Sequence, residues 1–365
     1  MKTLKTLSFF LLITLLGCTT EEITNIYPIA EGLSKVNVYI EGDITNAESQ
    51  AQLEEEVGSL TENIYVQNTT QLTAITINGN NKLRNVIVDE NTLLNTLNVH
   101  TTNNLTSFIV KDSNTQLSTI NLHGTGKVAE VEIKNSKQNS TILIDGFTTA
   151  DKITIETLSN TSNNKTANIT CNDMQEINKF LAVNTSYTQN NTIAFPHLKI
   201  MGKYISETVY FFSGFSGKYT TFSFPALEEI YNLTLDGLNM DSITFPLVKK
   251  MNYFYLYFET NVNHFYFPQL TRCDNIEIFF NTGTLGTTYY TNTLFNMPLL
   301  NYCKNYRLNI LGFDNLNAED TLEKFLTIQP VSGKTIHLSN NTPLTGLGLT
   351  YKQTLIDQGN TVIVW

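Results

Sequence analysis

Two histidines, His100 and His123, have the spacing that comes closest to a metal site in this chain. Each lies six residues after the first leucine of a repeat unit, and one further unit separates the two. Equivalent positions in neighbouring coils stack, so both imidazoles are expected to face outward on one sheet. Zinc sites use three or four protein ligands, and the sequence offers no third ligand beside this pair. We therefore expect a solvated face without a metal.

Catalytic motifs are absent from the sequence. It contains no G-x-S-x-G elbow, H-E-x-x-H zinc motif, Walker-type phosphate loop or G-x-G-x-x-G dinucleotide loop. The net charge is -10, whereas nucleic-acid binding requires a basic surface. We therefore expect a protein that is not an enzyme, uses no cofactor and binds no nucleic acid.

Cys273 and Cys303 occupy the same position, five residues after a proline, in successive repeat units. Adjacent rungs of a sheet are about 4.8 Å apart, so a disulfide between these residues is geometrically conceivable. Met201, Ile230 and Met251 fill the same position in other units. This pattern favours two free cysteines in a buried hydrophobic ladder.

Four aromatic residues form the best candidate for a ligand-binding surface. Tyr255 and Tyr257 alternate with residues expected to face inward, so their rings face outward, and Phe279 is expected beside Tyr257 one coil later. Tyr266 is expected to face outward from the other row of strands. Exposed aromatic rings on a rigid sheet suit a protein hot spot or stacking on a glycan. The alternative is that insertions or a neighbouring chain cover them.

An apolar triplet of the form L-x-x-I-x-I recurs from residue 72, in steps of 11, 11, 11, 12 and 11 residues. Alternating apolar residues predict short strands with one face inward. Eleven extended residues cannot close a turn around a core, whereas two units can. Each coil is therefore predicted to contain two strands and about 22 residues. The triplets are Leu72/Ile75/Ile77, Leu83/Val86/Val88, Leu94/Leu97/Val99, Leu105/Phe108/Val110, Leu117/Ile120/Leu122 and Val128/Val131/Ile133.

A second repeat form carries a proline: FPHL, FPAL, FPLV, FPQL and MPLL begin at residues 195, 224, 245, 267 and 297. The two middle steps match one coil, whereas the first and the last step are longer. The long steps contain loop-like insertions near Ser213 and Gly283, and without about eight residues each they return to the same coil length. The residues five, eight and ten positions after each proline are predicted to point into the core and to stack from coil to coil as ladders. The proline itself suits a turn. Both repeat forms fit one continuous solenoid.

These repeats resemble the leucine-rich-repeat-like surface proteins of Bacteroidota known as BspA-like, over about residues 60–365. The FPxLxxI…LxL form is also similar to receptor L-domains. The resemblance implies a mainly β fold: a right-handed, leucine-rich-repeat-like β-solenoid with helical caps. In a leucine-rich-repeat horseshoe, helices between the strands form the convex side. Here the segments between the predicted strands are too short for helices, which favours a flat β-solenoid.

Residues 1–17 are typical of a signal peptide, with two lysines followed by an apolar core too short to span a bilayer. The following LLGC sequence, which ends at Cys18, resembles the lipobox of bacterial lipoproteins. That resemblance implies cleavage before Cys18, lipidation of its thiol and stable attachment to a membrane by two or three acyl chains. Two glutamates soon after Cys18 resemble a surface-export signal. We therefore expect an outer-membrane lipoprotein exposed at the bacterial cell surface.

The remaining chain is predicted to form caps around the solenoid. A strand at Val36–Ile40 and a helix over 46–57, capped by Asn46, precede the repeats. At the other end, Asn317 is predicted to cap a helix, and a strand at Lys334–Leu338, a helix over Thr350–Gln358 and a strand at Thr361–Trp365 follow. The predicted segments are a signal peptide (1–17), a lipidated tether (18–34), an N-terminal cap (35–62), a solenoid with 11-residue half-coils (63–144), irregular coils (145–192), a solenoid with FPxL repeats (193–312) and a C-terminal cap (313–365).

Residues 145–192 interrupt the repeat and are rich in Asn, Thr and Ser. One short helix is predicted at Asp173–Val183, because Met174, Ile177 and Leu181 share a helical face and Glu176 completes a capping box. We interpret this stretch as irregular coils that join the two repeat forms. A domain boundary is the alternative.

The function predicted first is that of a non-catalytic, surface-exposed lipoprotein that binds or adheres to extracellular protein ligands as a monomer. The protein is expected to attach to the membrane through its N-terminal lipid. Two alternatives remain open: a glycan-capture protein of a polysaccharide-uptake system, and a passive structural component of the envelope.

Overall fold

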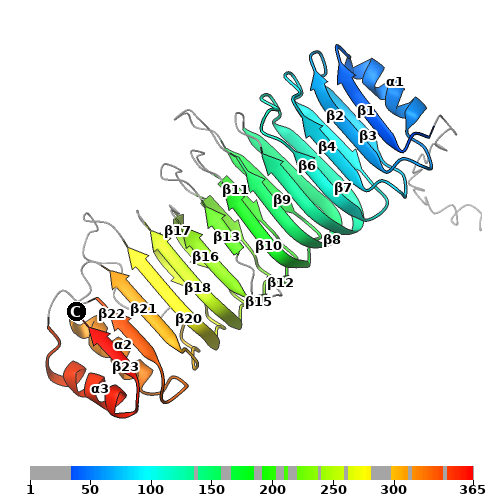
Figure 1. The fold of residues 1–365 in the computed structure, drawn as a ribbon. Coiled ribbons are helices and arrows are strands. Elements are labelled where there is room, and N and C mark those ends of the chain that lie inside the picture. Colours follow the sequence, from blue (N-terminus) through cyan, green and yellow to red (C-terminus); the bar gives the residue numbers. More distant parts are fainter. Residues whose placement is uncertain are drawn as a thin grey trace, which may run out of the picture.

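The computed structural model describes residues 34–134, 139–157, 166–184, 191–202, 209–212, 220–236, 240–258, 262–280, 297–310, 315–339 and 343–364. The chain is mainly β, and its parallel strands wind into an elongated β-solenoid (Figure 1). The solenoid has about 11 turns of about 23 residues each. The predicted mainly β solenoid of about 22 residues per coil is therefore confirmed.

The first coils contain two rows of strands that alternate along the chain. From β2 to β5, each strand pairs with the strand two places further on, as Asn63 pairs with Asn85, one coil later. This pairing confirms two strands per coil. One row contains β1 (Asn37–Gly42), β2 (Asn63–Thr69), β4 (Asn85–Asp89) and β6 (Leu105–Val110); the other contains β3 (Ala74–Asn78) and β5 (Thr96–His100); the long strands β7 (Thr119–Lys134) and β8 (Ser140–Glu156) extend both rows.

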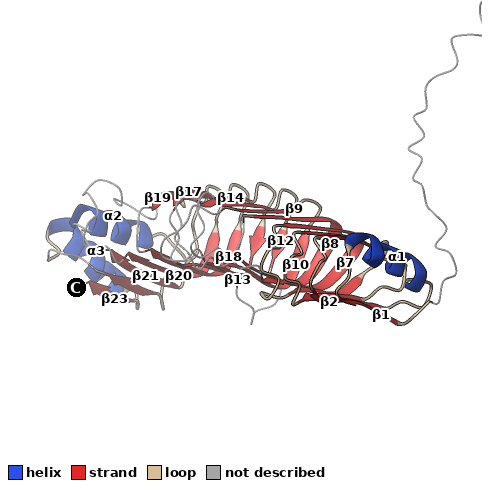
Figure 2. Ribbon diagram, turned by 90° about the horizontal axis from the view of Figure 1, so that it is seen from above, coloured by secondary structure: helices blue, strands red, loops and turns tan. Residues whose placement is uncertain are grey.

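The later coils gain a third, short side. Figure 2 shows the two long rows facing each other across the core. The row that begins with β1 is called the main row. It continues through β10 (Glu176–Asn184), β13 (Val209–Phe212), β16 (Asn232–Asp236), β18 (Lys250–Phe258), β20 (Arg272–Phe280) and β21 (Asn305–Ile310). The opposite row comprises β9 (Ala167–Cys171), β11 (Asn191–Ala194), β14 (Thr220–Ser223), β17 (Met240–Thr244) and β19 (Val262–Tyr266). The third side comprises β12 (Ile200–Met201), β15 (Glu229–Ile230) and the first residues of β10, β18 and β20, and it continues residues from the middle of β7 and β8.

Inward side chains form continuous ladders through the core, as the spacing after each proline predicts. Ile230 pairs with Met201 one coil earlier, and both are buried. The phenylalanines of the FPxL units stack on one another, with ring-centroid distances of 5.2, 5.9 and 5.3 Å from Phe195 to Phe267. The amide of Leu227 donates to the carbonyl of Phe224 at 3.3 Å, so the proline lies inside a tight turn. Each unit therefore closes its turn while adding one ring to the ladder.

Buried asparagines join the first coils. The Asn91 side chain donates to Asn114 Oδ1 at 2.9 Å and to the carbonyl of Val66 at 2.8 Å. Its own Oδ1 accepts from the Thr69 hydroxyl at 2.7 Å. Asn91 and Asn114 are buried, although the position of Asn114 is shifted by one residue in the repeat. The hydrogen bond between coils therefore forms although Asn114 lies one residue later in its repeat unit than Asn91 does.

In the described part of residues 145–192 the solenoid continues, but the helix predicted there is wrong. There β8, β9 and β10 continue the parallel rows, and the helix predicted over Asp173–Val183 is absent, because residues 176–184 form β10. Strand β10 pairs with β8 through a register shift between Ile177 and Phe180. This irregularity spaces Ile177 and Leu181 four residues apart, which imitates a helical face.

The N-terminal cap contains β1 and α1 (Asn46–Glu56). The helix is capped by Thr45, with Glu48 completing a capping box, so the prediction that Asn46 is the cap is wrong. The Asn46 side chain instead accepts from the Thr73 amide at 2.8 Å and ties the helix to the first coil. No helix among the described residues is long and apolar enough to span a bilayer.

The C-terminal cap has the predicted helix–strand–helix–strand order: α2 (Asn315–Phe325), β22 (Thr335–Leu338), α3 (Gly346–Asp357) and β23 (Thr361–Val364). Asn317 lies inside α2 and does not cap it, and α3 begins four residues earlier than predicted. Lys334 is buried, and its ammonium donates to the carbonyls of Phe325 and Ile328 at 2.9 and 2.7 Å. It thereby satisfies the carbonyl of the last residue of α2, which has no partner within the helix, and a second carbonyl in the turn that follows.

Candidate functional site

The outer face of β18 and β20 brings three of the four predicted aromatic residues together. Tyr257 pairs in register with Phe279. The rings of Tyr255 and Phe279 lie 5.6 Å apart between centroids, tilted by 42°. All three side chains are half-buried, while the alternating residues Phe254 and Leu256 are fully buried. The predicted inward and outward directions are therefore confirmed.

Two residues that the sequence reasoning missed extend this group. Tyr253 stacks near Tyr255 at 6.3 Å, and the guanidinium of Arg307, on the next strand β21, lies 5.0 Å from the centre of the Phe279 ring. A long step of the repeat separates Arg307 from Phe279, which obscures their contact in the sequence. We call Tyr253, Tyr255, Tyr257, Phe279 and Arg307 the aromatic patch.

Tyr266 does not join the aromatic patch. It is 44% exposed, as predicted, but it belongs to the separate two-stranded sheet of β17 and β19. The adjacent Phe267 packs inward against Phe254, at 5.1 Å between ring centroids. Any ligand that contacts the patch therefore approaches a different side of the coil from Tyr266.

His100 and His123 stack in register on β5 and β7, with 6.0 Å between ring centroids. Partial burial, and then the neighbouring His123, lower the pKa of His100. The next residue in the row is Asp145, whose carboxylate lies 3.5 Å from His123 Nδ1. Among the described residues, no three His, Cys, Asp or Glu side chains are grouped to hold a metal ion. The charge of this histidine row can therefore change with pH, but the described residues around it form no metal site.

The three cysteines in the described part of the chain are free and buried. Cys273 and Cys303 occupy successive coils, and their thiols donate to the carbonyls of Asn275 and Asn305 at 3.2 and 3.3 Å. Burial raises the pKa of both thiols well above the usual value. The interpretation of this pair as core residues is therefore confirmed. Cys18 lies outside the described residues.

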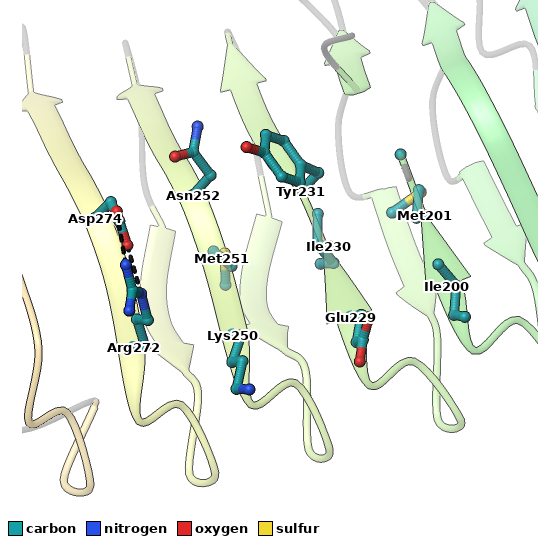
Figure 3. A pocket seen from close by; sticks show the side chains of 11 residues that line it. Ile200, Met201, Glu229, Ile230, Tyr231, Lys250, Met251, Asn252, Arg272 and Asp274 are labelled. Carbon is teal, nitrogen blue, oxygen red and sulfur yellow. Dashed lines mark hydrogen bonds and ion pairs between the residues drawn. The ribbon is translucent and has the colours of Figure 1, made fainter. Parts of the chain in front are cut away.

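A second candidate surface, which the sequence reasoning did not identify, is a hollow of about 380 Å³ on the third side of the later coils. Figure 3 shows its polar side chains in two rows, with Glu229, Lys250 and Arg272 below and Tyr231, Asn252 and Asp274 above. These residues lie four and six positions after the proline of each unit. Aligning the repeats on their prolines would have revealed both rows.

Comparisons with protein-family models, with curated proteins and with solved structures return no match for this chain. Its function must therefore be inferred from the sites themselves.

Proposed function

We propose that this chain is a non-catalytic lipoprotein, anchored to the outer membrane through Cys18 and exposed at the cell surface, that binds an extracellular protein. The observation that carries the proposal is the aromatic patch, in which Tyr255 and Phe279 lie beside Arg307 on one rigid sheet. Tyr and Arg are enriched among the residues that dominate protein–protein binding energy. The lipobox-like sequence before Cys18 supports the anchor.

The composition of the patch favours a protein over a glycan as the ligand. The tilt of 42° between Tyr255 and Phe279 breaks the flat platform on which a sugar ring would stack. The same tilt forms a ridged surface into which side chains of a partner can pack. Buried ladder residues on both sides of each tyrosine fix the strand that carries the rings, which lowers the entropy lost on binding. A monomer suffices, since the whole patch lies on one chain.

The proposal is tested by binding the soluble fragment, beginning near Ile23, to an array of purified extracellular matrix and secreted proteins. Wild type is expected to bind at least one of them. Tyr255→Ala/Tyr257→Ala is expected to weaken that binding by about 10- to 100-fold, because hot-spot residues cost about 2 kcal/mol or more. The matched control is Tyr39→Ala/Tyr65→Ala, which removes another stacked tyrosine pair, 4.8 Å apart, from the first coils. Equal loss in both variants would contradict the proposal.

The anchor is tested separately by labelling cells with radioactive palmitate. Wild type is expected to incorporate the label and fractionate with the outer membrane, whereas Cys18→Ala is expected to lose both properties because no thiol remains to carry the lipid. Label retained in Cys18→Ala would show that lipidation occurs elsewhere or that the band is not this protein.

A further inference from the structure

The third side of the later coils carries a continuous trough. The hollow of about 380 Å³ adjoins a second one of about 450 Å³, and Lys250 and Arg272 line both. The second hollow continues past Arg272 to Tyr302 and Gln329. We call the two together the trough. Its residues in β18 and β20 lie toward the beginning of these strands, whereas Tyr255, Tyr257 and Phe279 of the aromatic patch lie toward their end. The two surfaces share no residue and adjoin at Asn252 and Tyr253.

One wall of the trough is a row of six side chains from six successive coils: Ile200, Glu229, Lys250, Arg272, Tyr302 and Gln329. Each is the register partner of the next. Neighbouring strands are about 4.8 Å apart, so the row extends for about 24 Å. A ligand that follows this wall must be long, narrow and linear.

The other wall consists of Tyr231, Asn252 and Asp274 (Figure 3). Arg272 connects the two walls, because its guanidinium donates to both Asp274 carboxylate oxygens at 2.7 and 3.1 Å. The same guanidinium stacks 4.0 Å above the Tyr302 ring. A planar guanidinium held by Asp274 and Tyr302 keeps its remaining donors in a fixed orientation beside the trough.

Several polar groups along the trough are available to a ligand. Glu229 and Lys250 are exposed, and neither side chain makes a hydrogen bond or ion pair with another described residue. Asn252 uses its amide nitrogen to donate to Asn232 at 3.0 Å, and its amide oxygen accepts no hydrogen bond from another described residue. The tyrosine rings of Tyr231 and Tyr302 add apolar surface beside hydroxyl groups.

The backbone of the trough is already occupied by bonds between coils. Tyr231 donates its amide to Met201, Asn252 to Tyr231, and Lys304 to Asp274, at 3.0, 2.8 and 3.0 Å. A peptide in the trough would cross the strands and could not add a strand to the sheet. The lining also has two cations, Lys250 and Arg272, and two anions, Glu229 and Asp274. This balance disfavours a polyanionic ligand.

We propose that the trough binds a linear, uncharged glycan that lies along the solenoid axis across several coils. Sugar hydroxyls both donate and accept, and the carboxylate, amide, phenol and guanidinium groups of the two walls complement both roles. The apolar faces of the sugar rings pack against Tyr231 and Tyr302. The trough and the aromatic patch share no residue, so this inference does not depend on binding of a protein at the patch.

The test is calorimetric titration of the soluble fragment with cellohexaose, laminarihexaose, mannohexaose, xylohexaose and maltohexaose. At least one is expected to bind, and its affinity is expected to fall at least tenfold for the corresponding disaccharide, because the shorter chain reaches fewer coils. Arg272→Met and Tyr231→Ala are each expected to weaken the hexasaccharide at least tenfold. Both are surface substitutions, and far-ultraviolet circular dichroism checks that each variant is folded.

Two controls separate this site from the aromatic patch. Tyr255→Ala/Tyr257→Ala and Tyr39→Ala/Tyr65→Ala are expected to bind the hexasaccharide like wild type. The proposal is overturned if no neutral hexasaccharide binds at millimolar concentration, if only an oligoguluronate, a charged probe of the same length, binds, or if Arg272→Met binds like wild type. Loss in Tyr255→Ala/Tyr257→Ala together with retention in Arg272→Met would move the glycan to the aromatic patch and would also overturn it.

Discussion

The first coils, built from residues 63–134, and the later coils, built from residues 191–310, share one core but present different surfaces. In both regions, successive coils align their inward residues in fully buried ladders. On the outer surface of the first coils, polar side chains largely bind one another, as in the Lys111–Asp89 ion pair at 2.6 Å and the Asn85–Asn63 bond at 2.6 Å. The later coils carry the aromatic patch and the trough. The repeat period therefore determines the core, whereas the third side provides the room for a ligand.

The strongest test of a shared core is to remove one large side chain from each region. Phe108 and Phe254 are both fully buried, so Phe108→Ala and Phe254→Ala are each expected to cost about 3–5 kcal/mol through lost burial and a residual cavity. Urea denaturation followed by circular dichroism measures both.

Leu93→Ala and Leu247→Ala are the matched controls for this pair. The two leucines are 48% and 41% exposed, so each substitution is expected to change the free energy of unfolding by less than about 0.5 kcal/mol. Costs for Phe108→Ala and Phe254→Ala that differ by more than about 2 kcal/mol, well outside the error of extrapolation, would show that the two cores are not equivalent.

The side-chain amide of Asn91 in the first coils is buried, whereas that of Asn252 in the trough is half-buried. Asn91→Ala removes the buried hydrogen bonds that its side chain makes with the carbonyl of Val66 and with the Thr69 hydroxyl, which is expected to cost about 1–3 kcal/mol. Asn252→Ala removes a half-buried amide that donates to Asn232. Its cost is expected to stay below about 1 kcal/mol, because water reaches this wall of the trough. Equal costs in the same denaturation experiment would remove the distinction between the two regions.

The smallest expected effect is a pH dependence confined to the first coils. The pKa of His100 in the folded chain lies below its ordinary value of 6.5, so the unfolded chain binds more protons in this range and stability rises with pH. The contribution of His100 is complete above about pH 6.5 and is lost as pH falls through the lowered value. Melting temperatures at about pH 7.5 and about pH 5.5 should therefore differ less in His100→Gln than in wild type. An unchanged difference would contradict this account of the histidine row.

The sequence was sufficient to predict the ladders, because a fixed spacing of apolar residues leaves little choice of which side chains face inward. Leu233, Phe254 and Ile276 are all inward, eight residues after their prolines. On the third side the same spacing predicts the inward residue five positions after each proline, such as Met251, but not the corner that follows it. Asn252 and Tyr253 are two consecutive residues that are not buried, so the alternation breaks where the strand turns the corner. The same break in β10 places the buried residues Ile177 and Leu181 four positions apart, as on one face of a helix, and this led to the helix prediction.

The candidate sites were predicted only in part, for a related reason. Tyr255, Tyr257 and Phe279 follow from alternation within one strand and from the regular register between Tyr257 and Phe279. Arg307 and Tyr302 enter from a coil that follows a longer step, so that its register partners, such as Asn275 and Asn305, are further apart in the sequence. A step of variable length hides such contacts until the coils are stacked in space.

The central claim is that ligands bind the later coils and not the first ones. It is tested most directly by hydroxyl-radical footprinting of the soluble fragment, alone and with a bound extracellular protein from the array. Protection is predicted at Tyr255, Tyr257 and Phe279, with no change at Tyr39 and Tyr65. Protection of Tyr39 and Tyr65, with Tyr255 and Phe279 labelled as in the free protein, would contradict the claim.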